Sequence, residues 1–106
     1  MSEQKPSIGR IVHYKLTAED AAQVNRRRTN GKSIGERIAS GKWPEGAQAH
    51  IGNGASENDT RPMVITQVWP DGKVNGQVLL DGNDALWVTS ITEGDKPGAW
   101  AWPPRA

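Results

Sequence analysis

The sequence contains no cysteine and no phenylalanine, and it has only one tyrosine. The absence of cysteine excludes disulfide bonds and thiolate chemistry, and it favours the cytosol, because small secreted domains often depend on disulfides. No apolar run is long enough to span a bilayer. Residues 1–6 are not followed by the hydrophobic stretch of a signal peptide. These absences predict a cytoplasmic protein that does not enter a membrane.

Apolar residues are also scarce, at 35% of the 106 positions. A chain of this length is one domain, residues 1–106, and on folding it buries only ~65% of the surface that its unfolded chain exposes. Five tryptophans can supply much of such a thin core, because each is large. A thin core gains from self-association, so we expect a homo-oligomer.

The net charge is only +1, which gives no overall attraction to nucleic acid. The charges are nevertheless separated along the chain. The middle is basic, with Arg26, Arg27, Arg28, Lys32, Arg37 and Lys42, and the later part is acidic, with Asp71, Asp81, Asp84, Glu93 and Asp95. Opposite halves of this kind can pair within one chain, between copies or with a charged ligand.

The first part of the chain predicts a strand followed by two helices. Residues 8–16 have the β-branched and aromatic character of a strand. Thr17 is a helix N-cap with Asp20 three residues later, and the helix should run to about Arg28, with Gly31 as a left-handed C-cap. Ser33 opens a second helix over 33–41 through a Ser-x-x-Glu capping box. Residues 45–60 are rich in Gly, Asn and Ser, which predicts a loop with at most a short strand near residue 50.

The remainder, about 62–102, predicts a β-meander with strands over 63–69, 73–80, 85–92 and 99–102. Pro70-Asp71-Gly72 and residues 81–84 supply the turns between them. The predicted fold is therefore α+β but mainly β. It is a small SH3-like β-barrel or an antiparallel meander, with a two-helix insertion at about 17–60 after the first strand.

Residues 31–33, Gly-Lys-Ser, resemble the end of a phosphate-binding P-loop. The P-loop also needs a glycine where Arg26 stands and a strand in front, so this is not an ATPase motif. A helix N-terminus beside arginines still favours an anion, and an aromatic ring nearby can stack on a base. The predicted ligand-binding residues are Arg26, Arg27, Arg28, Gly31, Lys32, Ser33, Arg37 and Trp43.

The alternative interpretation of this cluster is a solvated basic face beside an ordinary helical turn. Consecutive helical positions point about 100° apart, so the three arginines cannot all face one ligand, and Arg26 is the one expected to be dispensable.

The sequence contains no readable catalytic or metal-binding constellation. His13 and His50 have no partner at ligand spacing, and the Gly-x-Ser-x-Gly motif is absent. We therefore expect no enzymatic activity, no metal and no cofactor. Among the tryptophans, Trp69 and Trp87 are expected in the core or at a barrel end, while Trp100 and Trp102 share one face of an extended segment and pack down on the barrel.

Five blocks of the chain resemble a family of small uncharacterised phage and prophage proteins. These blocks are residues 9–14 (GRIVHY), 74–78 (VNGQV), 80–84 (LDGND), 87–90 (WVTS) and 98–103 (GAWAWP). The resemblance spans nearly the whole chain, with 17–60 as the variable part, and it implies no activity and no site residues.

The setting that this resemblance implies is a phage protein that acts on its host. By analogy with phage proteins that sequester the cyclic nucleotide signals of bacterial immunity, we expect a binding protein for a small phosphate-bearing ligand. The alternative is an SH3-like module that binds a host protein or nucleic acid.

Overall fold

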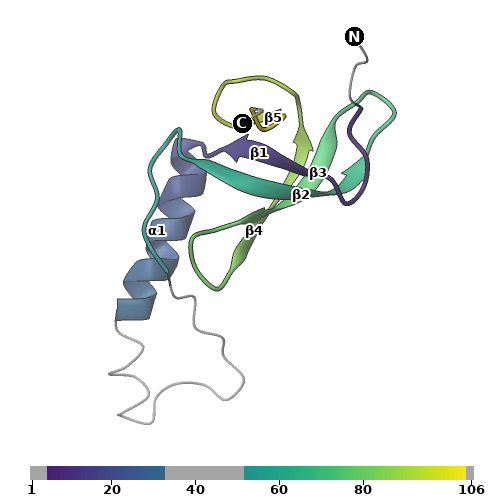
Figure 1. The fold of residues 1–106 in the computed structure, drawn as a ribbon. Coiled ribbons are helices and arrows are strands. Elements are labelled where there is room, and N and C mark those ends of the chain that lie inside the picture. Colours follow the sequence, from purple (N-terminus) through teal and green to yellow (C-terminus); the bar gives the residue numbers. More distant parts are fainter. Residues whose placement is uncertain (1–4, 33–51, 105–106) are drawn as a thin grey trace.

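The computed structural model describes residues 5–32 and 52–104 (Figure 1). Within this part the chain is mainly β, with one helix. The elements in chain order are β1 (Ile11–Lys15), α1 (Ala18–Lys32), β2 (Thr60–Val68), β3 (Val74–Leu79), β4 (Ala85–Ile91) and β5 (Trp100–Ala101). The predicted second helix over 33–41 and the short strand near residue 50 lie outside the described residues.

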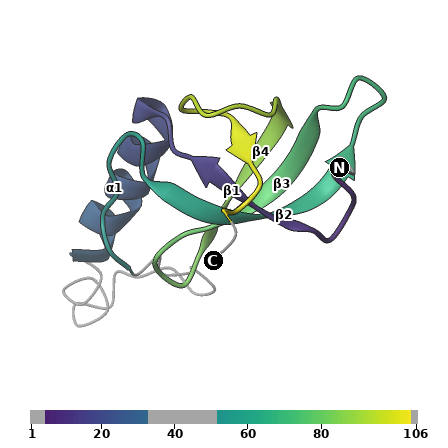
Figure 2. The same cartoon turned by 45° about the horizontal axis from the view of Figure 1, so that its top comes forward.

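In the described ranges the strands form a single antiparallel sheet in the order β4-β3-β2-β1-β5. The predicted meander is therefore confirmed, since β2, β3 and β4 are neighbours both in sequence and in the sheet. β5 lies against β1 at the other edge (Figure 2). The segment after β4 returns to β5, where Trp100 N–H donates to Thr92 O (3.1 Å) and Gly94 N–H donates to Trp100 O (2.8 Å).

The turn between β2 and β3 forms as its residues predict. Gly72 has φ +91°, a conformation that favours glycine. The Asp71 carboxylate accepts the backbone N–H of Lys73 at 3.0 Å. The backbone N–H of Trp69 donates to Lys73 O at 2.8 Å and closes the hairpin. Aspartate and glycine thus each have the role that turn chemistry assigns to them.

The core lies on one face of the sheet because alternate strand residues point the same way. In β3 the predicted inner set of Val74, Gly76, Val78 and Leu80 is buried as expected. The helix adds Ala21 and Val24, and β5 adds Trp100, which is 1% exposed. The opposite face of the sheet, here called the outer face, carries the residues between these inner positions.

The start of α1 confirms the predicted cap. Asp20 N–H donates to Thr17 Oγ1 and Thr17 N–H donates to Asp20 Oδ2, both at 3.0 Å. The Tyr14 hydroxyl donates to the same carboxylate oxygen at 2.5 Å. Burial, and then this hydrogen bond, raises the pKa of Tyr14 above its ordinary value. The cap therefore ties the helix to β1.

The predicted end of α1 is wrong, because the helix continues through Gly31 to Lys32. A glycine inside a helix costs only about 1 kcal/mol relative to alanine, which tertiary contacts can offset. Such contacts are made on the turns just before it by Asn25, Arg27 and Arg28. Gly31 is thus part of the helix and does not end it.

The tryptophans are distributed differently from the prediction. Trp100 and Trp102 do pack together, with ring centroids 5.3 Å apart at 88°. Trp87 is 61% exposed, so its expected place in the core is wrong. Leu86 and Val88 point inward, and strand alternation therefore turns Trp87 to the outer face. Trp69 is 41% exposed beside the first turn, where its indole N–H donates to Asn75 Oδ1 at 3.0 Å.

Candidate functional site

Two of the predicted ligand-binding residues are held by an internal carboxylate. Arg28 binds both oxygens of Asp84, with Nη2 to Oδ1 at 2.9 Å and Nη1 to Oδ2 at 3.1 Å. Arg27 Nη1 donates to Asp84 Oδ2 at 2.8 Å and to Ala85 O at 3.0 Å. Two-pronged arginine–carboxylate pairs are among the stronger hydrogen-bonded contacts in proteins. The basic middle and the acidic later part of the sequence therefore pair here within one chain.

The segment that leads into β2 joins the same cluster. Arg28 Nε donates to Asn53 O at 2.9 Å, and Asn25 exchanges two hydrogen bonds with the backbone of Ala55. Asn53 N–H donates to Asp81 O at 2.8 Å, beside a bridge between Gly52 and Gly82. Figure 1 shows this segment running along α1. We call the assembly of Asn25, Arg27, Arg28, residues 52–55 and residues 81–85 the arginine junction.

The electrostatics of the arginine junction are those of a structural contact. The Asp84 side chain is 3% exposed and that of Arg28 is 10% exposed. Burial raises the pKa of Asp84, but the hydrogen bonds and charges of Arg28 and Arg27 outweigh burial and hold that pKa below its ordinary value. The carboxylate is thus charged and paired at neutral pH.

The structure describes only some of the other predicted residues of the cluster. Arg26 is exposed, and Gly31 and Lys32 lie in the last turn of α1. Ser33, Arg37 and Trp43 lie outside the described residues. That this cluster binds a phosphate stays a prediction, and the described contacts of Arg27 and Arg28 give these two residues a role in joining the helix to the sheet.

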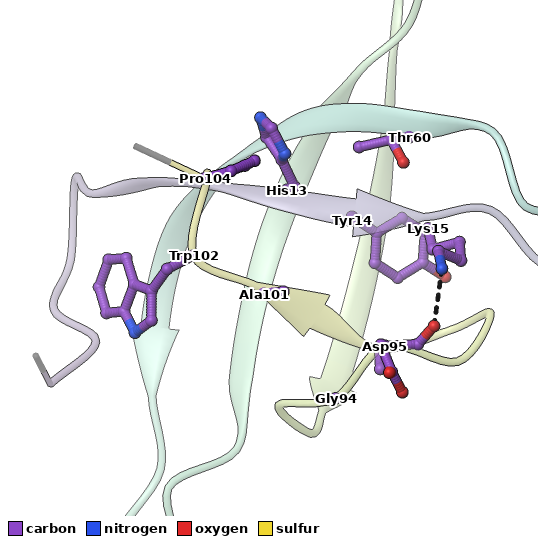
Figure 3. Close-up of a pocket in the computed structure, with 10 residues that line it drawn as sticks. His13, Tyr14, Lys15, Thr60, Gly94, Asp95, Ala101, Trp102 and Pro104 are labelled. Carbon is purple, nitrogen blue, oxygen red and sulfur yellow. Dashed lines mark hydrogen bonds between the residues drawn. The ribbon is translucent and has the colours of Figure 1, made fainter. Parts of the chain in front are cut away.

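A different group of residues lines a pocket of about 150 Å³ where β5 lies against β1 (Figure 3). His13 and Lys15 come from the outer positions of β1, and Thr60 comes from the start of β2. Figure 3 shows Lys15 and Asp95 at one end and Trp102 at the other. We call this the β1–β5 pocket; its lining consists of His13, Tyr14, Lys15, Thr60, Gly94, Asp95, Ala99, Ala101, Trp102 and Pro104.

The pocket forms because small residues lie between large ones. Ala101 stands opposite His13 in the strand register, and its methyl group fills little space. Gly94 and Ala99 leave further room on the link to β5. The chain passes Trp102 and reaches Pro104, which brings both of these residues to the rim. His13 and Lys15 thus line this hollow from the outer face, whereas Trp102 packs on the core beside Trp100 and reaches the rim.

The two basic side chains of this region, Lys15 and Arg10, have no acidic partner among residues 5–32 and 52–104. Lys15 Nζ donates to the backbone carbonyl of Asp95 at 2.7 Å, and none of the ion pairs there includes Lys15, His13 or Arg10. The Arg10 guanidinium lies 4.9 Å from the ring centroid of Trp102, a cation–π contact that helps to hold the ring. Positive charge beside an aromatic ring suits an anion that carries a flat group.

Sequence reasoning missed this pocket because its residues are distant in sequence. His13 and Ala101 come together only through the pairing of β1 with β5, a non-local contact. The alternation of β1 was a usable signal, since Val12, Tyr14 and Leu16 are inward and His13 and Lys15 must then share the outer face.

Neither a metal site nor a membrane-spanning helix occurs in the described ranges. No group of three or more His, Cys, Asp or Glu side chains gathers there in a way that could hold a metal ion. The helix in the same part of the chain lacks the length and apolar character needed to cross a bilayer. Comparison of the chain with protein-family models, with curated proteins and with solved structures gives no match.

Proposed function

We propose that this chain is a non-enzymatic binding protein for a small phosphate-bearing ligand of the nucleotide class, and that the ligand occupies the β1–β5 pocket. The carrying observation is that Lys15, His13 and Trp102 line one hollow in which no carboxylate pairs with Lys15 within the described residues. The Lys15 ammonium and the His13 imidazole suit phosphate oxygens, and the part of the Trp102 ring that reaches the rim can contact a base.

The β1–β5 pocket is a different site from the basic cluster on the helix that the sequence predicted. A phosphate at Arg27 and Arg28 would have to displace a carboxylate that is 3% exposed and bound at 2.8 and 2.9 Å. Removing a charge from a buried pair costs about 3–5 kcal/mol, which a ligand would have to offset before it gained affinity. The β1–β5 pocket requires no such rearrangement, because Lys15 donates only to a backbone carbonyl.

Sequestration of an immune nucleotide by a phage protein fits this geometry. A protein that only withdraws a signal needs a pocket that holds the ligand and no catalytic group. The sequence resemblance to small phage and prophage proteins supports the same setting. The host cytoplasm is the proposed location.

The direct test is calorimetric titration of the protein with a panel of mononucleotides and cyclic nucleotides. Lys15→Ala removes one charge-assisted hydrogen bond, about 1.5–3 kcal/mol, and should weaken binding roughly 10- to 100-fold. Lys73→Ala is the matched control, because Lys73 is an exposed lysine beside the β2–β3 turn. If the wild-type protein binds no member of the panel, the proposal is wrong.

We also infer that the sheet forms a small barrel of the SH3-like kind. The strand order β4-β3-β2-β1-β5 and the long connection between β1 and β2 are consistent with that topology. The bridge between Glu93 and Trp100 supports closure, since it connects the end of the β4 edge to the β5 edge. Closure removes exposed strand edges, which reduces aggregation.

The second candidate function is a protein-interaction module, and the observation that favours it is the outer face. Trp87, Leu79 and Ile11 are 61%, 43% and 55% exposed. Exposed tryptophans and neighbouring apolar side chains are common at protein interfaces. If this function is correct, Trp87→Ser should abolish capture of a host protein by the purified chain, while nucleotide titrations of the wild type remain flat.

A further inference from the structure

A second hollow lies where β2 begins and β3 ends, beside the outer-face residues Pro62 and Leu79. It measures about 370 Å³ and is lined by Arg61, Pro62, Leu79, Leu80 and Asp81. Pro62 comes from β2 and Leu79 from the last position of β3, and both are exposed. We call it the β2–β3 groove. It has an apolar floor with one positive and one negative side chain beside it.

The two hollows are neighbours across the sheet. Pro62 stands opposite His13 in the pairing of β2 with β1, and His13 stands opposite Ala101 in the pairing of β1 with β5. Met63 pairs with Val78, so the next residues along each strand, Pro62 and Leu79, also lie side by side. Directly paired residues point to the same face. One continuous row thus runs from Leu79 through Pro62 and His13 to Ala101.

The separation of the hollows sets the shape of a ligand that fills both. Adjacent strands are about 4.8 Å apart, and two strand spacings separate the middle of one hollow from the middle of the other, about 10 Å. Stacked bases are only about 3.4 Å apart. A ligand with a base in each hollow must therefore hold the two bases unstacked, with the linking phosphate near His13.

The chemistry of the β2–β3 groove suits a second base. Apolar side chains such as Pro62 and Leu79 provide a flat contact for a ring that has left its stack. The Asp81 carboxylate accepts one hydrogen bond from Asn53 Nδ2 at 2.7 Å and retains capacity for a base amino group. Arg61 is paired with Asp59 at 3.4 Å and donates to Thr60 O at 2.9 Å, and its guanidinium has further N–H groups that can donate to a ring nitrogen or carbonyl.

We propose that the ligand is a dinucleotide, with one base in the β1–β5 pocket, the other in the β2–β3 groove and the bases splayed apart. This proposal rests on the proposed function, because it assumes that the β1–β5 pocket binds a nucleotide. It adds a second subsite and a ligand class that a single pocket does not specify.

The test compares adenosine 5′-monophosphate with the linear dinucleotide 5′-phosphoadenylyl-adenosine by calorimetric titration of the full chain. Contact of the second base with Pro62 and Leu79 should make the dinucleotide bind about tenfold more tightly or better. Leu79→Thr keeps a strand-forming residue but removes the flat contact. It should reduce dinucleotide affinity to that of the monophosphate and leave monophosphate affinity unchanged. Ile8→Thr, an exposed apolar residue that lines neither hollow, is the control.

The outcomes separate the two proposals. If the monophosphate binds and the dinucleotide binds no more tightly, the second subsite is wrong while the proposed function stands. If neither binds, both are wrong. If the dinucleotide binds more tightly but Leu79→Thr and Ile8→Thr retain the full difference, the second base does not lie in the β2–β3 groove, and the proposal is overturned. Thermal melts of both variants establish that they are folded.

Discussion

The arginine junction and the β1–β5 pocket both gather cationic side chains, but their cations have different surroundings. In the junction, Arg27 and Arg28 bind a carboxylate that is 3% exposed. In the pocket, Lys15 reaches only a backbone carbonyl, and Arg10 lies over an indole ring. A cluster of positive charge in a sequence therefore does not identify a ligand site. A ligand site differs from a structural contact in that the fold itself supplies no opposite charge to its cations.

The largest expected effect is on stability, from loss of the junction carboxylate. Asp84→Ala leaves two arginines without their partner and should lower the free energy of unfolding by about 3–5 kcal/mol. A small domain has only about 5–15 kcal/mol in total. Urea denaturation measures the loss. Asp71→Asn removes the charge of an exposed pair with 3.9 Å between charged atoms but keeps an oxygen that accepts the Lys73 N–H, so it should change stability by less than about 1 kcal/mol. Equal effects of the two variants would contradict the role of the junction.

Two glycine substitutions, one in the arginine junction and one in the β1–β5 pocket, extend the comparison between these regions. A Cβ on Gly52 would lie 2.4 Å from Asp81 O and 2.5 Å from Gly82 Cα, both backbone atoms that cannot move independently. Gly52→Ala should therefore destabilise the protein by about 1–3 kcal/mol. Gly94→Ala, in the lining of the pocket, meets only Ala99 Cβ at 3.4 Å and should stay within about 0.5 kcal/mol of wild type. Thermal or urea unfolding of both variants checks the difference.

Acid should weaken the junction in a defined pH range. The folded state holds the pKa of Asp84 below its ordinary value, so the stabilisation is present above the unfolded pKa of about 3.9. It is lost as the pH falls through the lower folded-state pKa. The difference in unfolding free energy between wild type and Asp84→Asn should therefore shrink from pH 5 downward. A difference that stays constant to pH 2 would show that ionisation of Asp84 does not stabilise the fold.

The smallest effect is expected from the pocket, where stability should hardly change. Lys15→Ala removes an exposed hydrogen bond to a carbonyl, and such surface changes stay within about 0.5 kcal/mol. The urea midpoint of this variant should match that of wild type, while its nucleotide affinity falls. A large loss of stability in Lys15→Ala would show that Lys15, like the arginines of the junction, mainly stabilises the fold.

Local signals in the sequence predicted the elements of the sheet. The turn at 70–72 and the cap at Thr17 and Asp20 form with the hydrogen bonds expected of them. These features depend on residues within a few positions of one another, which is why they can be read from a sequence. The end of α1 was mispredicted for the opposite reason, since the contacts of Arg28 with Asn53 and Asp84 join residues that are far apart in the chain.

The candidate site was less accessible to prediction than the fold. The charge pattern correctly indicated that the basic middle and the acidic later part can pair within a chain, but it did not single out Asp84. The pocket depends on β5 lying next to β1, across 87 intervening positions between His13 and Ala101. Trp87 was predictable, because Leu86 and Val88 on either side are the apolar residues that strand alternation turns inward.

The most direct test of the contrast between the two regions is a nucleotide titration followed by amide NMR of the whole chain. The account predicts that the largest shifts occur at His13, Lys15, Thr60 and Ala101, while Arg27, Arg28 and Asp84 stay where they are. It would be contradicted by shifts concentrated at residues 26–28 and 84–85 with the signals of 13–15 and 99–102 unchanged, because the ligand would then have displaced the Asp84 carboxylate from the arginines.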